Sequence, residues 1–473
     1  MLKLLKSIIN NQTMLFVIGG FLPAGLNLIF IPIFTQYLSP EEFGIYAYTN
    51  AFQSIFIVIS TLSINSYLLR FYFEKDDKSR REMFGTIFIF LTLISLIILS
   101  ILILVMPRLV PEISEDVPFK PYFLLMILTV FFEYIYVIPQ VIWRVKKQAL
   151  TFLIFAFTRM LLIQLLALLL IVYWDFGILG RYWANIVISA GLSLFVIKII
   201  ASHSRFIIKI GLLKEALRFS IPILPAALLG VIYNAIDKII LVRYLSLDQL
   251  GLYSVAAAIG FAILISSQGY YKAIEPVIFE SFNTPRFSST IKNINKFQIL
   301  ALFSISLIIA AFSKELVTIF FSEPFYDSYR YIPFFLIAFS LNASRNIVST
   351  SLHAYKITKL DFPIVIISLF FYIVSFYTLV PFFGVIGALF SLVISAFISL
   401  IASVWFIKKY IQTDWYIAIQ LLLSVFILLV GVFNELDLEI YYYYELMIKS
   451  LLLLIYIYFV YKSLKRNPEL IPR

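Results

Sequence analysis

The sequence contains no cysteine and only two histidines among its 473 residues. The absence of thiols excludes a disulfide framework and any thiolate metal or redox site. His203 and His353 are predicted to stand singly in loops without partner ligands, and Asp76 and Asp77 belong to a solvated charge run. We therefore expect neither a bound metal nor a resident cofactor.

Nucleotide-binding and catalytic patterns are also missing. The chain has no Gly-x-x-x-x-Gly-Lys-Ser/Thr sequence, so this chain is not expected to hydrolyse ATP. The longest predicted outer loops hold only about fifteen residues, such as 107–121, and none of them collects catalytic groups. We do not expect an enzyme.

Charged residues are scarce, at 13% of the chain, whereas 62% of the residues are hydrophobic. A soluble protein of this length could not bury that much apolar surface. The apolar residues form runs of roughly twenty, which is the length that crosses a bilayer as a helix. The first run follows two lysines and lacks a small-residue cleavage site, so we expect a retained anchor. The pattern predicts an all-α polytopic membrane protein.

Fourteen transmembrane helices are predicted from these runs. They cover residues 14–37, 44–72, 83–106, 122–142, 150–173, 180–201, 219–243, 251–274, 297–321, 331–352, 362–382, 384–407, 416–433 and 446–461.

The basic residues test this topology independently. With the amino terminus inside and several residues near span ends assigned to the adjoining segment, 26 of the 37 lysines and arginines are counted as inner, Arg144 among them, and six as outer, Arg181 among them. The other five are counted within spans: Arg70, Arg159, Lys238, Arg345 and Lys449. Short cytoplasmic loops of membrane proteins hold such an excess of basic residues. We therefore predict cytoplasmic termini at both ends and attribute the net charge of +11 to topology rather than to nucleic-acid binding.

An internal repeat divides the chain. YLSPEEFGIY at 37–46 returns as YLSLDQLGLY at 244–253, and FGILG at 176–180 returns as FGVIG at 383–387. Both pairs are offset by 207 positions and occupy equivalent places between predicted spans. Because each repeat contains an even number of spans, the two six-helix halves are predicted to be parallel and related by an axis along the membrane normal.

This repeat predicts the domain organisation. We expect a six-helix lobe at 1–201, a cytoplasmic linker at 202–218, a second six-helix lobe at 219–407, and two additional helices with a cytoplasmic tail at 408–473. The corner at 37–46 is interpreted as a tight hinge, in which Gly44 lets the second span begin close to the first.

The proline-bearing first span, the sequence LSPEEFGIY at 38–46, and Asp237 before a second Gly-x-Tyr resemble Wzx-type O-antigen and oligosaccharide flippases. These form the polysaccharide transporter family within the multidrug/oligosaccharidyl-lipid/polysaccharide exporter superfamily, and the resemblance covers about residues 10–407. It implies a V-shaped, two-lobed carrier with two extra C-terminal helices. It further implies alternating-access transport of undecaprenyl-diphosphate-linked oligosaccharide repeat units from the inner to the outer leaflet of the bacterial cytoplasmic membrane.

The resemblance also implies partners and alternatives. A lipid-linked oligosaccharide and the bilayer are the expected partners, together with other polysaccharide assembly proteins. A multidrug cation antiporter of the same superfamily would want acidic residues in its cavity, whereas Arg159 and Arg345 favour an anion. A flippase for another lipid-linked cell-wall precursor is a third reading. Coupling to protons, sodium or the membrane potential is open.

Ionisable residues within the predicted spans are the candidate site. Arg159 lies near the middle of the fifth span, where it could bind a phosphate or a sugar carboxylate, and Gln164 follows it. Glu133 in the fourth span lies at similar depth. It is interpreted either as a structural ion-pair partner of Arg159 or as a carrier of a coupling proton.

Two further arginines are substrate-binding candidates. Arg345 lies in the tenth span beside Asn342, either in a cavity or snorkelling towards the membrane surface. Arg70 lies at the inner end of the second span, where it either anchors the interface or receives the diphosphate.

Asp237 in the seventh span is predicted to take part in ion coupling or helix pairing, with the adjacent Lys238 pointing elsewhere. Four prolines at the first helix of each half are hinge candidates, with static kinks as the alternative. They are Pro23, Pro32, Pro222 and Pro225.

Overall fold

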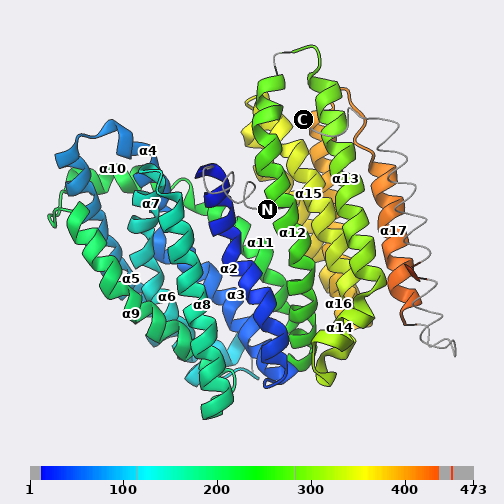
Figure 1. Cartoon of the computed structure of the whole chain (residues 1–473), viewed down its shortest axis with the longest axis horizontal. Coiled ribbons are helices and arrows are strands. Elements are labelled where there is room, and N and C mark those ends of the chain that lie inside the picture. The colour runs from blue at the N-terminus through cyan, green and yellow to red at the C-terminus, as the bar shows by residue number, and fades with distance from the viewer. Residues whose placement is uncertain (1–11, 114–115, 283, 436–448, 451–473) are drawn as a thin grey trace, which may run out of the picture. The chain divides into compact units, whose positions relative to one another are not determined.

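The computed structural model describes residues 12–113, 116–282, 284–435 and 449–450, and in these residues it contains helices and turns but no strand (Figure 1). The chain divides into two compact units, Met1–Gly251 and Leu252–Arg473. The predicted all-α architecture is confirmed. The finer boundaries of lobes and linker stay a prediction.

The first unit holds ten α-helices within the described residues. They are α2 (Gln12–Thr35), α3 (Pro40–Thr61), α4 (Ile64–Phe71), α5 (Asp77–Ile113), α6 (Leu124–Glu133), α7 (Val137–Val145), α8 (Ala149–Trp174), α9 (Leu179–His203), α10 (Ile210–Ser220) and α11 (Leu224–Leu241).

The next helix, α12 (Leu247–Ser281), begins in the first unit and continues in the second. The remaining described helices follow in the second unit. They are α13 (Phe287–Ala311), α14 (Ser313–Phe320), α15 (Ile332–Ala354), α16 (Asp361–Ile407) and α17 (Ile417–Phe433).

Ten helices of the described residues are long and apolar enough to cross a membrane. One of them, α16, has 47 residues and changes direction at Gly384, so it accounts for the predicted spans at 362–382 and 384–407. The described part of α2 and α17 give shorter apolar helices. The predicted span at 446–461 lies outside the described residues except for positions 449 and 450. The chain is therefore a multi-pass membrane protein.

The two repeated corners start their helices in the same way. Ser39 caps α3: its hydroxyl accepts from the Glu42 amide, and the Glu42 carboxylate accepts from the Ser39 amide. In the second corner, Ser246 and Gln249 make the same reciprocal pair at the start of α12. This capping box satisfies backbone donors that a helix start leaves open.

The two corners also contact each other, within the first unit. A Cβ placed on Gly44 would overlap the carbonyl oxygen of Leu247, and one placed on Gly251 would overlap that of Pro40. Leu247 is the repeat equivalent of Pro40, so the contact is reciprocal. Sequence reasoning assigned Gly44 to the approach of the first two spans; the structure instead shows that it admits the backbone of the other corner.

The second repeated motif, FGILG at 176–180 and FGVIG at 383–387, also has equivalent glycines in both halves. Gly177 and Gly384 both have positive φ, 51° and 55° respectively, a conformation that side chains disfavour. Near the first of them, the Ile178 amide donates to Glu42 Oε1 over 2.7 Å, which ties the turn before α9 to the first corner.

The segment between α9 and α10 is bound to α5. The Arg205 carbonyl occupies the space where Gly85 lacks a side chain, and Thr86 accepts from the Lys209 amide while donating to the Ile207 carbonyl. Buried Glu82 forms ion pairs with Lys209 and, at 3.5 Å, with Arg205. The predicted linker is therefore packed on the first unit.

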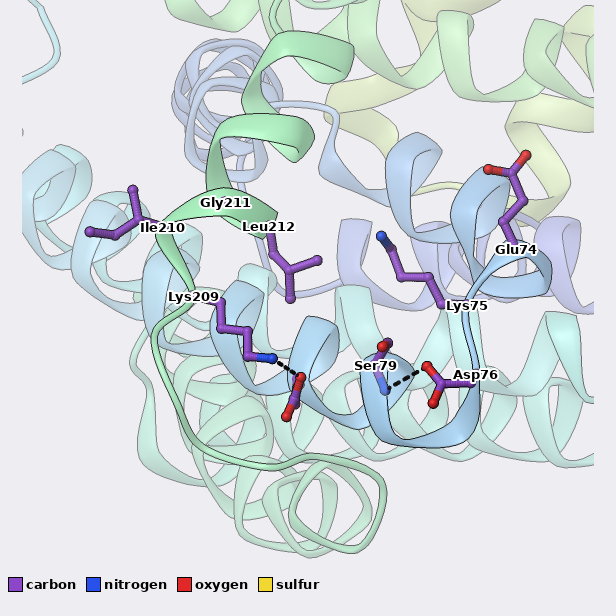
Figure 2. Close-up of a pocket in the computed structure, with 9 residues that line it drawn as sticks. Glu74, Lys75, Asp76, Ser79, Lys209, Ile210, Gly211 and Leu212 are labelled. Carbon is purple, nitrogen blue, oxygen red and sulfur yellow. Dashed lines mark hydrogen bonds and ion pairs between the residues drawn. The ribbon is translucent and has the colours of Figure 1, made fainter.

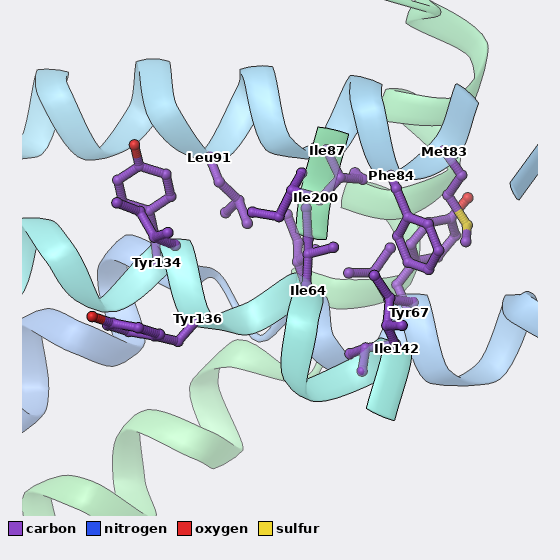
Figure 3. Packing of buried hydrophobic residues seen from close by; sticks show 14 of the residues in the cluster. Ile64, Tyr67, Met83, Phe84, Ile87, Leu91, Tyr134, Tyr136, Ile142 and Ile200 are labelled. Atoms are coloured by element: carbon purple, nitrogen blue, oxygen red, sulfur yellow. The ribbon is translucent and has the colours of Figure 1, made fainter. Parts of the chain in front are cut away.

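A hydrophobic cluster of the first unit joins α4, α5, α7 and α9 (Figure 3). Tyr67, Phe84 and Ile200 are almost completely buried in it. Tyr136, at its edge, donates from its hydroxyl to the Ser189 carbonyl over 3.0 Å. The cluster thus fixes α7 and α9 relative to each other, and these two helices form part of the cavity described below.

In the second unit, Lys449 forms a buried ion pair with Glu315 of α14, with Nζ 2.7 Å from Oε1. Asn434 donates to the Ala310 carbonyl and to the Ser313 hydroxyl. These contacts attach the end of α17 and residue Lys449 to α13 and α14.

Candidate functional site

A cavity of about 580 Å³ lies within the first unit, between α2, α3, α7, α8 and α9. We call it the amide cavity because five carboxamide side chains line it: Asn27, Asn50, Gln140, Gln164 and Asn185. Three arginines line it as well: Arg144, Arg159 and Arg181.

Helical periodicity explains which residues face this cavity. The lining residues of α8 are spaced three and four apart, which places them on one face of a helix. They are Phe152, Phe155, Ala156, Arg159, Met160, Ile163, Gln164 and Ala167. On α9, Arg181 and Asn185 are one turn apart, and Ser189 continues the same face. We call the polar residues on these two helix faces the polar wall: Arg159, Gln164, Arg181, Asn185 and Ser189.

Arg159 is held by several groups at once. It forms a bidentate ion pair with Glu133, whose longer contact joins Nη1 to Oε2 at 3.4 Å. Its Nη2 also donates to the Ser189 hydroxyl at 3.3 Å, and its guanidinium lies 4.0 Å from the centroid of the Tyr136 ring. About one fifth of each side chain of the pair is exposed. The predicted pairing of Glu133 with Arg159 is therefore present.

Arg181 is more buried, with 7% of the residue exposed. Its guanidinium carbon lies 4.8 Å from the centroid of Phe34 and 4.1 Å from that of Tyr46. Its Nη2 donates to Asn27 Oδ1 at 3.1 Å. In the described residues it has no carboxylate within ion-pair distance.

Asn27 of α2 connects α8 and α9. Its Oδ1 accepts from Arg181 and also from Gln164 Nε2 at 3.2 Å. Because both contacts use the oxygen, the amide nitrogen of Asn27 is available as a donor. This hydrogen-bond network joins α2, α8 and α9, and it includes Gln164, which the sequence analysis named as a substrate-binding candidate.

The electrostatic character of the amide cavity follows from its lining. No carboxylate is among the lining residues, and Glu133 reaches the cavity only through its pair with Arg159. Guanidinium groups bind oxyanions, and carboxamides offer both donors and acceptors to hydroxyl groups. The described residues contain no cluster of three or more His, Cys, Asp or Glu side chains that could hold a metal.

Arg345 and Asn342 lie on α15 in the second unit, one turn apart. The Arg345 Nη1 atom is buried and has no hydrogen-bond partner in the described part of the chain. Neither residue lines the amide cavity. Their predicted role in substrate binding stays a prediction.

Arg70 lies apart from the amide cavity, at the end of α4. It is exposed and forms an ion pair with Glu74, one turn later on the chain. A second hollow nearby, between the starts of α5 and α10, has acidic and basic residues that largely neutralise each other, such as Lys209 with Glu82 (Figure 2). This hollow lacks the cationic excess of the amide cavity.

Asp237 lies in α11, where only 7% of it is exposed. Lys238 Nζ lies 3.1 Å from Asp237 Oδ2, so the two adjacent side chains meet. The expectation that Lys238 points elsewhere is wrong, because its long chain bends back to the buried carboxylate. The role of Asp237 in coupling or pairing stays a prediction.

The proline candidates fall into two groups. Pro23 and Pro32 lie inside α2. Pro222 stands in the turn between α10 and α11, and Pro225 is in the first turn of α11. The second pair therefore marks a helix start rather than a bend within a helix. The role of these four prolines as hinges stays a prediction.

Sequence reasoning missed Arg181 as a site residue because the charge count placed it in an outer segment. It also counted Arg144 with the inner-loop residues. The signal that could have found Arg181 is the spacing of Arg181, Asn185 and Ser189, which puts three polar groups on one face of an otherwise apolar helix.

Comparisons with known proteins agree with this architecture. The chain is similar over 95% of its length to the solved structure of the lipid II flippase MurJ in an inward closed conformation, covering 99% of that chain with a TM-score of 0.74 and 16% identity. It is similar over 84% of its length to a mutant of the Vibrio cholerae MATE transporter VcmN, covering 96% of that chain with a TM-score of 0.54 and 14% identity. At these identities the likeness concerns the fold.

No curated protein sequence matches the chain. The family model described as "Polysaccharide biosynthesis protein" matches residues 10–282, more than half of the sequence. This agrees with the family predicted from the corner sequence and the first span. The chain therefore belongs to the polysaccharide biosynthesis protein family.

Proposed function

We propose that this protein is a flippase for undecaprenyl-diphosphate-linked oligosaccharide repeat units of the O-antigen or a related polysaccharide. It moves them from the cytoplasmic to the outer leaflet of the bacterial inner membrane by alternating access, with both of its own termini in the cytoplasm. Sugars and a diphosphate require a polar, cationic path, while the polyprenyl chain stays in lipid.

The composition of the amide cavity carries this proposal. Five carboxamides can exchange hydrogen bonds with sugar hydroxyls, and the arginines can bind phosphate oxygens. Tyr46, Phe152 and Phe155 add aromatic surface to the same walls. This combination suits a large, polar, anionic substrate.

The rival function, export of drug cations, is carried out by proteins with a similar fold but suits the amide cavity poorly. A cation site needs acidic groups, whereas the described lining has arginines and no carboxylate. A lipid II-like cell-wall precursor, in contrast, also carries a diphosphate and sugars, so it is the closer alternative. The two flippase substrates differ in their sugars.

The driving force is proposed on electrostatic grounds. Moving a group with two negative charges outward across an inside-negative membrane is favoured by about 4 to 5 kcal/mol at 100 mV. Exchange of a proton or sodium ion at Glu133 or Asp237 is a second source of energy. If the rate of flipping in proteoliposomes depended on neither the membrane potential nor an ion gradient, this account would be wrong and the protein would act by passive facilitation.

Deletion of the gene, followed by analysis of lipid-linked sugars, tests the function. We expect a diphosphate-linked repeat unit to accumulate with its sugars facing the cytoplasm, and its composition would name the substrate. Accumulation of a peptidoglycan precursor would favour the cell-wall alternative. Unchanged glycans together with altered drug sensitivity would overturn the proposal in favour of an exporter.

As a complementation control, the wild-type gene supplied on a plasmid must restore lipid-linked sugars that face outward. Arg159→Gln should restore them poorly while reaching the membrane in normal amounts. Arg70→Gln is the matched control, because Arg70 is an exposed arginine outside the amide cavity. Full complementation by Arg159→Gln, as by Arg70→Gln, would remove Arg159 from the substrate site.

A further inference from the structure

The three arginines of the amide cavity are spread along it rather than gathered at one point. Arg144 lies 5.7 Å from the centroid of Phe152, and Arg181 shares Asn27 with Gln164. Phe152 and Gln164 are twelve residues apart on α8, a rise of about 18 Å. A single diphosphate is shorter than that, so it cannot occupy both ends of the cavity.

The middle arginine is already neutralised. Arg159 has a carboxylate, a hydroxyl and an aromatic ring as partners. Arg144 is exposed at the cavity's end. Arg181 thus differs from both: it is deeply buried, and in the described residues it has no acidic counterpart.

A buried cation without a counter-charge is costly, and this cost must be offset. The two flanking rings and the single hydrogen bond to Asn27 offset part of it. The guanidinium carbon lies 4.8 Å from the centroid of Phe34 and 4.1 Å from that of Tyr46, and these contacts together with the hydrogen bond to Asn27 hold the planar group in one place. A fixed guanidinium offers paired N–H donors that match two oxygens of an oxyanion.

The neighbouring amide supports the same ligand. Asn27 uses its oxygen twice for protein contacts, which leaves its NH₂ group as a donor towards the cavity that it lines. Arg181 and Asn27 therefore present donors side by side. Donors without an adjacent negative charge favour an oxyanion over a neutral hydroxyl.

We propose that Arg181, with Asn27, forms a second oxyanion subsite that recognises an acidic sugar of the repeat unit. The inference rests on the proposed flippase function and adds that the diphosphate binds at the Arg144 end of the cavity, where this guanidinium is exposed. The acidic sugar, a uronic acid or an equivalent carboxylate-bearing residue, then reaches the Arg181 end. The protein would thereby select acidic over neutral repeat units.

The test compares two synthetic substrates in proteoliposomes with the purified full chain. Both are polyprenyl diphosphates linked to the same oligosaccharide, one with glucuronic acid and the other with glucose at a single position. Flipping is measured as the fraction of sugar exposed to an impermeant glycosidase. We expect the wild type to flip the acidic substrate about tenfold faster than the neutral one.

Arg181→Gln should abolish this preference, so that the ratio of the acidic to the neutral flipping rate falls from about ten to about one. Arg144→Gln should slow both substrates alike, because both carry the diphosphate. Arg181→Lys, which keeps the charge but not the fork, should retain part of the preference and controls for folding. Thermal unfolding in detergent verifies that each variant is folded.

The outcomes separate the two proposals. Equal flipping of both substrates by the wild type overturns the acidic-sugar subsite while supporting the flippase. Equal slowing of both substrates in Arg181→Gln places Arg181 at the diphosphate or in the structure, and also overturns the subsite. If the folded wild-type protein flips neither substrate, both the flippase function and the subsite are rejected.

Discussion

Helices α8 and α9 of the first half and the two parts of α16 in the second half share their backbone landmarks. Gly177 and Gly384 lie 207 positions apart, and both take positive φ. Three residues later, a side chain on Gly180 or on Gly387 would collide with the end of the preceding helix. The same turn is therefore built twice.

The side chains on these helices differ sharply. Arg159 and Gln164 line the amide cavity, but the residues 207 positions later are Ile366 and Phe371. On the following helix, the equivalents of Arg181, Asn185 and Ser189 are Ala388, Leu392 and Ala396. Every one of these polar groups has an apolar counterpart in the second half.

This difference separates two kinds of information in the repeat. Small residues and caps preserve the helix turns in both halves, because backbone geometry leaves few alternatives. The polar wall occurs on one copy alone of this pair of helices. The fold is thus repeated, while the proposed sugar site is not, and variants can test each part separately.

The largest effect is expected where the halves are most alike, at the reciprocal contact of the corners. Gly44→Ala and Gly251→Ala each place a methyl group on a carbonyl of the other corner, so the backbones must move apart. We expect each variant to lose about 3 kcal/mol of stability. Thermal unfolding in detergent and the yield of folded protein measure this loss.

Gly191→Ala is the matched control for both corner variants. Gly191 lies within α9, and a Cβ there meets nothing within 4 Å. Because alanine favours a helix over glycine, this variant should be neutral or stabilised by up to about 1 kcal/mol. Loss of stability in only one of the two corner variants would show that the corners are not equivalent.

A smaller effect is expected in the polar wall, where the halves differ. Glu133→Gln leaves Arg159 without its counter-charge, and we expect a loss of about 2 to 3 kcal/mol, below the value for a fully buried pair because the pair is partly exposed. The double variant Glu133→Gln with Arg159→Ile introduces the apolar residue of the second half. It should recover most of that stability.

Flipping by the double variant then distinguishes structure from function. If the pair serves only the fold, the double variant flips at the wild-type rate. We expect it instead to be stable but slow, because the cavity has lost a guanidinium. Wild-type flipping by this variant would contradict a role of Arg159 in substrate binding.

The smallest effect concerns the caps. Glu42 accepts both the Ser39 amide and, at 2.7 Å, the Ile178 amide, whereas Gln249 caps its own helix. Glu42→Gln keeps only one accepting oxygen, so we expect a loss of about 1 kcal/mol. Gln249→Glu should change stability by less than about 0.5 kcal/mol.

Chemical denaturation in detergent can resolve this pair of variants. A loss in Gln249→Glu as large as that in Glu42→Gln would show that the second corner makes a contact equivalent to that of Glu42 with the turn before α9.

Much of the fold was predictable from sequence, because the apolar runs, the corner repeat and the glycine pairs are local patterns. The spans and the family follow from them, whereas α3 and α12 begin at Pro40 and Leu247, four residues before the predicted starts at 44 and 251. The ion pair of Glu133 with Arg159 was one of the two interpretations that their similar depth suggested. Depth places two charges at the same level, and few other partners were available.

The rest of the site was not predictable in this way. Arg181 was counted with outer residues because its position in the chain is close to a helix end, yet its side chain reaches Asn27 on another helix. Arg70 was a substrate candidate but lies outside the amide cavity. Gly44 was assigned to the wrong neighbour, since its real partner lies about two hundred residues away.

The sequence by itself determined the membrane-spanning helices, the repeat of 207 positions and the excess of basic over acidic residues in the chain. These are set by hydrophobic periodicity and composition, which act along the chain. Only the tertiary structure decided that five carboxamides and three arginines share one cavity, and that the corners interlock through glycines. Such contacts depend on how helices pack and rotate against each other, a choice that no local pattern encodes.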